Sequence, residues 1–271
     1  MPKTQYIELG DHTHIPILYE DRSVMALDKP PGWILAPDAW ENTRRNLQRA
    51  IDSCIMARFY WVRSRNLNYL RYVHRLDADT SGILLFARSP GALDTIGGLF
   101  EQREVEKRYL AVVYGTPRNS TWVCDAPLGP VPGRPGYMQV DPVEGKEAET
   151  HFRVLGTGRD TALIEARPTT GRTHQIRLHL LESGHPVIGD VLYGHEIGSA
   201  SRGRSRLGLR AVKLAYRDPF QRREVRIHAP TEAFLNEFGF LRDEGADAEQ
   251  VAPKVAPEKA RPPRQPNPRR N

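Results

Sequence analysis

Residues 74–82, His-Arg-Leu-Asp-Ala-Asp-Thr-Ser-Gly, carry more hydrogen-bonding groups than a turn requires. They stand directly before the apolar run Ile-Leu-Leu-Phe-Ala at 83–87, which is typical of a buried strand. Polar groups at the mouth of a buried strand are common catalytic groups, and a carboxylate such as Asp77 can act as a nucleophile or an acid/base group. The alternative is an Asx turn, in which Asp77 or Asp79 accepts hydrogen bonds from nearby backbone N–H groups.

Three histidines and an aspartate between residues 171 and 190 are of the types that bind metal ions. They are His174, His179, His185 and Asp190. We predict no metal site here, because residues five apart on a helix lie about 140° from each other around its axis. His174 and His179 would therefore face different directions, whereas metal-binding pairs on helices are usually spaced i, i+4.

Two further reaction classes lack their signatures. A retaining glycosidase needs two carboxylates that face one bond, and Asp79, two positions from Asp77, would not obviously face it. Gly156 and Gly158 form a Gly-x-Gly pair without the third glycine and the following helix of a dinucleotide-binding loop. This pair therefore indicates a hairpin turn.

The polar turn must be positioned by a fold that mixes strands and helices. Apolar runs and alternation predict strands at 17–21, 23–29, 83–87, 108–115 and 207–216, with a hairpin over 147–168. Apolar residues at helical spacing predict helices at 42–58, 91–102, 173–183 and 231–240, with Gly184 closing the third. Because strands and helices do not alternate regularly, the pattern favours an α+β fold on a mixed or antiparallel central sheet with flanking helices.

Basic residues are distributed unevenly along the chain. The formal net charge is +6, but residues 251–271 hold six cations against one acid, which leaves +1 for the first 250 residues. This proline-rich end has little to bury, so we predict a disordered tail over 246–271 that adds salt-sensitive affinity for RNA. Two stretches of the body, 57–75 and 197–217, hold cations without acids. They favour a nucleic-acid partner, the alternative being a solvated charged face.

Composition restricts the setting of the protein. Only Cys54 and Cys124 occur, so the chain has neither a disulfide framework nor a cysteine metal site. The first residues lack the basic-then-apolar pattern of a signal peptide, and no apolar run approaches the roughly 20 residues that cross a bilayer. We therefore expect a cytoplasmic protein without membrane contact and, in the absence of any protein-partner signal, a monomer.

Five stretches together resemble the RluA-type family of RNA pseudouridine synthases. In the family's order they are LDKPPG at 27–32, HRLDADTSG at 74–82, KRYLAVVYG at 107–115, GRTHQIRLHL at 171–180 and GHPVIGDVLYG at 184–194. The resemblance implies a two-lobed α+β catalytic domain over residues 1–245 with a central cleft, without the N-terminal RNA-binding domain of many relatives. It also implies isomerisation of uridine to pseudouridine in ribosomal or transfer RNA, with no metal and no organic cofactor.

The resemblance also implies roles for individual residues. Asp77 would be the catalytic carboxylate, and Arg177 would keep it ionised through paired hydrogen bonds. Tyr109 would stack on the uracil and assist proton removal, and Arg75 would fill the gap left by a flipped-out uridine. Lys107 would bind phosphate. The remaining substrate-binding candidates are Arg172, His174, Ile176 and Leu178, the last two as an apolar wall beside the base.

Each of these residues also has a structural alternative. Tyr109 could pack in a strand core, Arg177 could be a surface cation, and Lys107 could simply flank a strand. The main rival function is a non-catalytic RNA-binding or folding factor on the same scaffold. A DNA-binding protein is less favoured, because neither basic stretch resembles a recognition helix.

Overall fold

The computed structural model describes residues 2–35, 45–194 and 206–241. The strands of its main sheet are β1 (Tyr6–Glu8), β2 (His14–Glu20), β3 (Val24–Lys29), β4 (Arg71–Tyr72), β5 (Ser81–Ala87), β6 (Glu106–Tyr114), β7 (Thr121–Cys124), β10 (Thr150–Thr157), β11 (Thr161–Pro168), β12 (Leu209–Arg217) and β13 (Glu224–His228). A separate pair is formed by β8 (Leu128–Pro130) and β9 (Met138–Val140). The helices are α1 (Leu47–Met56), α2 (Tyr60–Arg63), α3 (Pro90–Glu101), α4 (Gln175–Glu182) and α5 (Glu232–Glu237).

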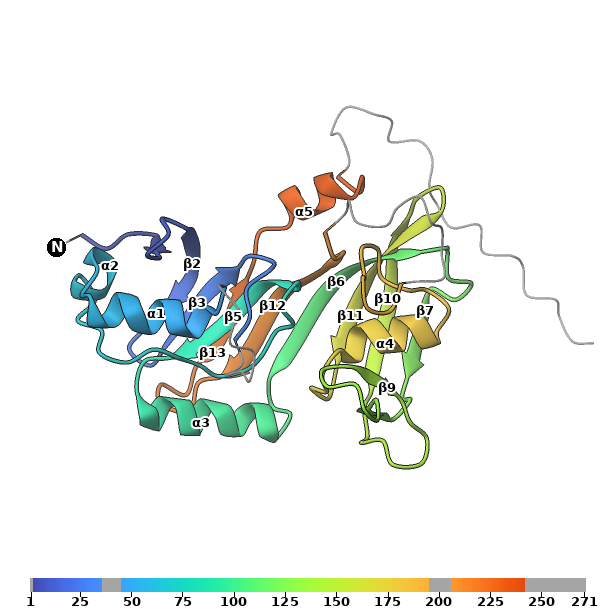
Figure 1. Cartoon of the computed structure of the whole chain (residues 1–271), viewed down its shortest axis with the longest axis horizontal. Coiled ribbons are helices and arrows are strands. Elements are labelled where there is room, and N and C mark those ends of the chain that lie inside the picture. The colour runs from blue at the N-terminus through green and yellow to red at the C-terminus, as the bar shows by residue number, and fades with distance from the viewer. Residues whose placement is uncertain (1, 36–44, 195–205, 242–271) are drawn as a thin grey trace, which may run out of the picture. The chain divides into compact units, whose positions relative to one another are not determined.

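The main sheet has a mixed topology. Over the described ranges its strands follow the order β1-β2-β3-β5-β12-β6-β11-β10-β7, with β4 also pairing with β5 and β13 with β12. The neighbours β12 and β5 are parallel, and the other paired strands are antiparallel. Figure 1 shows β12 between β5 and β6, and α4 against β10 and β11. The predicted α+β class with a mixed sheet and flanking helices is confirmed.

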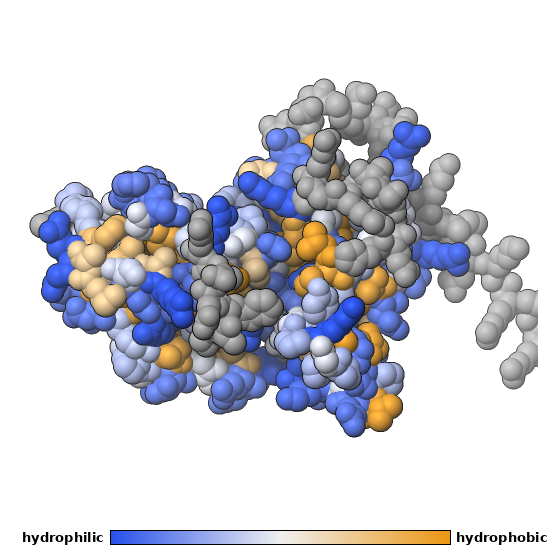
Figure 2. Space-filling model, in the orientation of Figure 1, coloured by the Kyte–Doolittle hydropathy of each residue, from blue (hydrophilic) through white to orange (hydrophobic). Residues whose placement is uncertain are grey.

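The central strands are apolar because they are covered on both faces. Six of the seven residues of β5 and five of the six residues of β3 are buried, so neither strand shows the alternation of a half-exposed strand. Helix α3 packs against β5. On the face shown in Figure 2, the surface of the described residues is largely hydrophilic with scattered apolar patches. This agrees with the burial of most apolar side chains in the core. The core therefore provides a rigid support for the turn that precedes β5.

The exit of that turn requires a glycine. Gly82 has a φ of +107°, and a Cβ placed on it would lie 2.1 Å from the carbonyl oxygen of Ala211 in β12. Here β12 pairs with β5 through Arg210 with Ser81 and Ala211 with Gly82. The backbone of β12 thus touches the backbone of the polar turn, an approach that only a residue without a side chain allows.

The helix ends follow from capping groups. Helix α1 begins at Leu47, later than the predicted residue 42, because the side chain of Asn46 accepts a hydrogen bond from the N–H of Arg49 (3.0 Å). Residues 42–44 lie outside the described ranges. Helix α3 begins at Pro90, close to the predicted residue 91, because the hydroxyl of Ser89 caps the N–H of Ala92 (3.2 Å). Helix α4 ends at Glu182, ahead of the left-handed Gly184.

Several elements escaped the sequence pattern. Strands β4, β7, β8, β9 and β13 and the short helix α2 were not predicted, and α5 is shorter than the predicted 231–240. The basic stretch 57–75 is not one surface, since Arg65 is buried and its Nε lies 2.7 Å from Glu20 Oε2. In the described part of 197–217, Arg210 is buried against Asp28 (2.7 Å).

The predicted tail at 246–271 lies outside the described residues. None of the described helices is long and apolar enough to cross a membrane.

Candidate active site

A cavity of about 470 Å³ opens beside the turn that precedes β5. Its volume lies within the range of small-molecule sites. Seven of the predicted site residues line it, namely Arg75, Asp77, Lys107, Tyr109, Arg172, His174 and Ile176. They come from the polar turn, from β6 and from the segment that leads into α4 together with the first turn of that helix, so three distant stretches of sequence meet at one cavity.

Asp77 meets Arg177 across 100 positions of sequence. Nη1 of Arg177 lies 3.3 Å from Oδ2 of Asp77 and donates a hydrogen bond to it. The Asp77 side chain is 22% exposed and that of Arg177 only 6%. The carboxylate thus faces the cavity, while the guanidinium holds it from the protein side. This arrangement keeps the carboxylate oriented.

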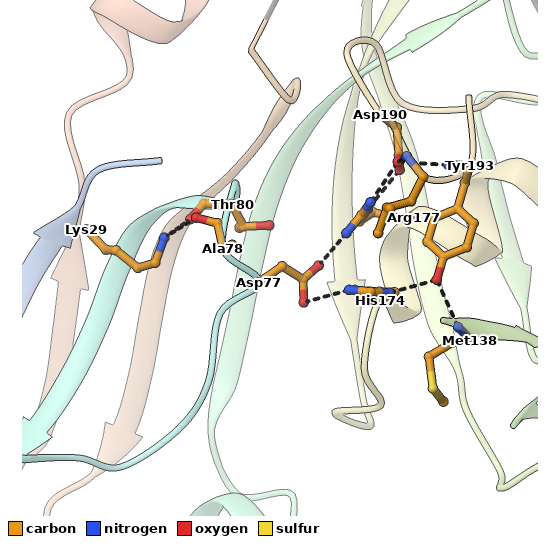
Figure 3. Close-up of polar contacts among 10 residues, drawn as sticks. Lys29, Asp77, Ala78, Thr80, Met138, His174, Arg177, Asp190 and Tyr193 are labelled. Atoms are coloured by element: carbon orange, nitrogen blue, oxygen red, sulfur yellow. Dashed lines mark hydrogen bonds and ion pairs between the residues drawn. The ribbon is translucent and has the colours of Figure 1, made fainter. Parts of the chain in front are cut away.

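Asp190 holds Arg177 in turn. Its carboxylate accepts two hydrogen bonds from the guanidinium, from Nε at 2.8 Å and from Nη2 at 2.7 Å. Oδ1 of Asp190 also accepts from the backbone N–H groups of Leu192 and Tyr193. Burial by itself would lower the pKa of Arg177, but Asp190 and then Asp77 raise it above its ordinary value. The guanidinium is therefore a permanent, fixed cation behind Asp77 (Figure 3).

His174 faces the other oxygen of Asp77. Its Nε2 lies 3.9 Å from Oδ1 of Asp77, and its Nδ1 lies 2.7 Å from the hydroxyl of Tyr193. The backbone N–H of Met138 donates to the same hydroxyl (3.1 Å). Figure 3 shows Asp77, His174, Tyr193 and Met138 in one line of polar contacts. His174 precedes α4 in a left-handed conformation (φ 57°), which turns its ring toward the cavity.

A buried lysine anchors the polar turn. The Nζ of Lys29 donates to the carbonyl oxygens of Ala78 (2.6 Å), Thr80 (2.9 Å) and Pro30 (3.1 Å). Burial lowers the pKa of Lys29 to about 8, against the opposing charges of Asp79 and Asp77. Lys29 thereby joins the turn after β3 to the turn before β5. The position of Asp77 depends on this junction.

Tyr109 and Lys107 project from the same face of β6 into the cavity. Burial, with a further contribution from Asp77, raises the pKa of the Tyr109 hydroxyl above its ordinary value. Burial lowers the pKa of Lys107 to about 8, and its Nζ donates to the carbonyl of Thr170 (3.1 Å). At neutral pH the cavity therefore contains an un-ionised phenol and a largely protonated amine.

His74 also lines the cavity, in a structural role. Its ring stacks on Phe100 with centroids 4.8 Å apart, and its Nε2 accepts from the N–H of Leu85 (3.2 Å). Burial lowers the pKa of His74 to about 3. This imidazole is neutral at physiological pH and ties the polar turn to the strand that follows it.

Leu178 lies elsewhere. It is not among the described residues that line the cavity, and packs instead in a core cluster with Leu128 and Ala148. Helix α4 turns it away because residues 176 and 178 differ by about 200° around a helix axis. The expected apolar wall therefore retains Ile176 alone.

The histidines weighed as metal ligands have separate partners. His179 contacts the Thr150 hydroxyl (2.9 Å) and the Ala126 carbonyl (3.0 Å), and His185 contacts the Tyr114 carbonyl (3.2 Å). His174 and Asp190 belong to the arrangement around Asp77. Over the part of the chain that the structure describes, no group of three or more His, Cys, Asp or Glu residues could hold a metal ion.

Cations surround the mouth of the cavity. Arg75, Arg103 and Arg172 line it, and Arg75 is exposed. Glu147 pairs with Arg103 (3.0 Å), and its backbone carbonyl accepts from Nε of Arg172 (2.9 Å). Arginines at the rim of a cavity attract a phosphate backbone, and they can do so here without entering the cavity.

Comparison with known proteins agrees with this geometry. Residues 23–182 match the family of RNA pseudouridylate synthases. The chain belongs to this family. It is 34% identical over 239 residues to ribosomal large subunit pseudouridine synthase C of Vibrio cholerae, covering 87% of this chain and 71% of that protein. It is 31% identical over 224 residues to synthase D of the same organism, covering 79% and 66%.

A solved structure gives the same assignment. The chain superposes on human RNA pseudouridylate synthase domain containing 1 with a TM-score of 0.64 and 26% identity, covering 80% of this chain and 83% of that one. The protein is accordingly a pseudouridine synthase, an isomerase that converts uridine to pseudouridine in RNA.

Four residues of this pseudouridine synthase's site went unassigned in the sequence, namely Lys29, Thr80, Asp190 and Tyr193. A lysine at the end of the apolar segment at 23–29 does not by itself signal a buried amine, because lysine is almost never fully buried unless it is paired. Asp190 and Tyr193 are three apart in the GHPVIGDVLYG stretch, a spacing typical of a side chain that caps a turn. Their contacts with residues 174 and 177 leave no local signal.

Proposed function

We propose that this pseudouridine synthase isomerises specific uridines in ribosomal or transfer RNA through Asp77. The observation that carries the proposal is the Asp77 carboxylate, held at 3.3 Å by the buried Arg177 and facing a cavity that Tyr109 also lines. The names of the relatives from Vibrio cholerae favour ribosomal RNA of the large subunit as the target.

The chemistry follows from the placement of these groups. The target uridine leaves its stack and enters the cavity, and Arg75 occupies the gap at a cost of a few kcal/mol in lost stacking. The ionised Asp77 acts on the sugar–base bond as a nucleophile or as an acid/base group, while Arg177 stabilises its charge. The N1–C1′ bond breaks, the base turns within the cavity, and a C5–C1′ bond forms. The proton on C5 is then removed and N1 takes up a proton, so the product is an isomer of the substrate.

Tyr109 stacks on the base as a neutral phenol. Its raised pKa disfavours the phenolate at neutral pH, so this side chain contributes an aromatic face more readily than a base. Ile176 provides an apolar contact, and Lys107 with Arg172 binds the neighbouring phosphates. His174 contacts the carboxylate rather than the base.

The decisive experiment compares two aspartates. Asp77→Asn removes the charge that faces the cavity, and the control Asp79→Asn removes an exposed charge two residues away. RNA from cells that carry wild type, either variant or no protein is mapped by carbodiimide-dependent primer extension. We expect pseudouridine stops with wild type and Asp79→Asn only. Stops that persist with Asp77→Asn would refute its role, and identical maps in all cells would favour the non-catalytic RNA-binding factor.

We further propose a catalytic domain over residues 1–245, a monomeric state and a cytoplasmic location, with 246–271 as an accessory basic tail. The two free cysteines and the RNA substrate support the location. Deleting residues 251–271 should flatten the salt dependence of RNA binding, because up to six cations are lost. An unchanged slope would contradict this.

A further inference from the structure

We propose that Tyr193 is a positioning residue, which fixes His174 as an N–H donor toward the second oxygen of Asp77. The inference starts from the line of contacts Met138–Tyr193–His174–Asp77. It rests on the proposed function, in that Asp77 is taken as the catalytic carboxylate. It assigns His174 to the carboxylate instead of the substrate and adds Tyr193 to the site.

The donors and acceptors in this line can be assigned. The backbone N–H of Met138 can only donate, so the Tyr193 oxygen accepts from it at 3.1 Å. The phenol has one proton of its own, and its other described partner is Nδ1 of His174 at 2.7 Å. That proton therefore goes to Nδ1, and the neutral imidazole carries its hydrogen on Nε2. The opposite tautomer would leave the phenol proton without an acceptor among the described residues.

The imidazole is held in its neutral form. Burial lowers the pKa of His174, and the nearby Arg177 acts in the same direction, against Asp77. The guanidinium of Arg177 also lies 5.0 Å from the centre of the Tyr193 ring, and the His174 and Tyr193 rings meet edge to face, with centroids 5.5 Å apart. Both rings are thus packed as well as hydrogen-bonded.

Each oxygen of Asp77 then faces its own donor. Oδ2 has the cationic Arg177 at 3.3 Å, and Oδ1 has the neutral Nε2–H of His174 at 3.9 Å. The second distance exceeds a hydrogen bond, and catalytic contacts of this kind often tighten in the complex with substrate. A neutral donor orients the carboxylate without neutralising it, so Asp77 keeps its reactivity.

Both donors depend on one turn. Asp190 binds Arg177 with two hydrogen bonds and also accepts from the backbone N–H of Tyr193 (3.1 Å), while the side chain of Tyr193 binds His174. The segment from Asp190 to Tyr193 therefore sets the two groups that face the catalytic carboxylate. Figure 3 shows these residues on one side of Asp77, opposite Lys29.

Tyr193→Phe tests the inference, since it removes the hydroxyl and keeps the ring beside Arg177. We expect kcat on a substrate RNA to fall about tenfold, with KM changed less than about twofold, because the lost contact orients the carboxylate and not the RNA. Tyr60→Phe is the matched control. Its hydroxyl binds the carbonyl of Pro2 (2.9 Å), outside the cavity lining, and its kinetics should equal those of wild type.

Nitrogen-15 NMR of the His174 ring gives a readout that a merely structural role would not move. In wild type we expect Nδ1 to carry no hydrogen and Nε2 to be protonated. Tyr193→Phe should show a mixture of the two tautomers, and Tyr60→Phe should match wild type. Thermal unfolding checks that both variants fold. His174→Gln, whose amide can stand in for Nε2–H, should retain more kcat than His174→Leu.

The outcomes separate this inference from the proposed function. A protonated Nδ1 in wild type, an unchanged tautomer in Tyr193→Phe, or a changed tautomer with unchanged kcat would each overturn the inference. Wild-type protein that makes no pseudouridine in any RNA would overturn the proposed function instead. The tautomer measurement needs no activity, so the line of hydrogen bonds is tested in either case.

Discussion

Gly82→Ala should detach the catalytic turn from the strand that supports it. A Cβ at this position would lie 2.1 Å from the Ala211 carbonyl oxygen and 2.8 Å from the backbone nitrogen and carbon of the same residue. These are backbone atoms of β12, which cannot move aside as a side chain would. The β5 and β12 backbones must therefore separate where they pair.

The size of the effect follows from two costs. Alanine at a φ of +107° costs about 1–3 kcal/mol. The parallel pairing of β5 with β12 consists of two register pairs at this point, and each hydrogen bond lost there costs about 1 kcal/mol. Together they amount to about 3–5 kcal/mol of the free energy of unfolding, a large share of the stability of an ordinary domain.

Urea unfolding followed by tryptophan fluorescence measures this loss, with Gly97→Ala as the control. Gly97 lies inside α3 with no atom within 4 Å of its added Cβ, so alanine there should stabilise by about 0.5–1 kcal/mol. Single-turnover assays should show activity lost in Gly82→Ala and kept in Gly97→Ala. A Gly82→Ala protein within about 1 kcal/mol of wild type would refute the close-approach argument.

Three further substitutions probe other contacts. Asp190→Asn removes the carboxylate that binds the buried Arg177 twice and leaves Asp77 at 3.3 Å as its remaining charged partner, so the unfolding free energy should fall by up to about 3–5 kcal/mol; a loss below 1 kcal/mol would contradict the paired geometry. Lys29 has a pKa of about 8 in the folded protein, against an ordinary value of 10.5. Between these two pH values the unfolded chain binds more protons than the folded protein. The unfolding free energy of wild type should therefore rise with pH in this window, by up to about 3 kcal/mol. Urea unfolding at several pH values should show no such rise for Lys29→Met. If the unfolding free energies of wild type and Lys29→Met changed with pH in parallel, the assignment of the rise to Lys29 would be wrong. The Thr80 hydroxyl is buried in the cavity wall without a hydrogen-bond partner in the described structure, so Thr80→Val should keep or raise the midpoint of thermal unfolding, and a clear fall would reveal a partner.

Local pattern predicted the elements whose signals are local. The apolar run of β5, the hairpin pattern of β10 and β11 and the helix predicted at 91–102 each identify an element within a few residues. The same reasoning missed β13, whose five residues show a clear alternation of exposed and buried positions but are mostly charged or polar on the outer face. Its strand character comes from pairing with β12.

The candidate site was predictable only in part, for a physical reason. Asp77 is signalled by its polar turn, but its contact with Arg177 spans 100 residues and came from the resemblance alone. The sequence at 57–75 reads as one basic surface, yet Arg65 is neutralised by Glu20, 45 residues earlier. Leu178 was misplaced because two residues along a helix reverse the direction of a side chain. Side chains that act through distant partners have no signature in their own neighbourhood.

The place of β12 has a consequence for how the protein is made. This strand lies between β5 and β6, although it is synthesised about 100 residues after β6. A fragment that ends at residue 182 would hold Asp77, Tyr109 and Arg177 but not the strand that sets the first two apart. A nascent chain therefore cannot assemble this catalytic centre before residue 217 has left the ribosome. Because β12 pairs with strands that are far from it in the sequence, we expect folding to be slow.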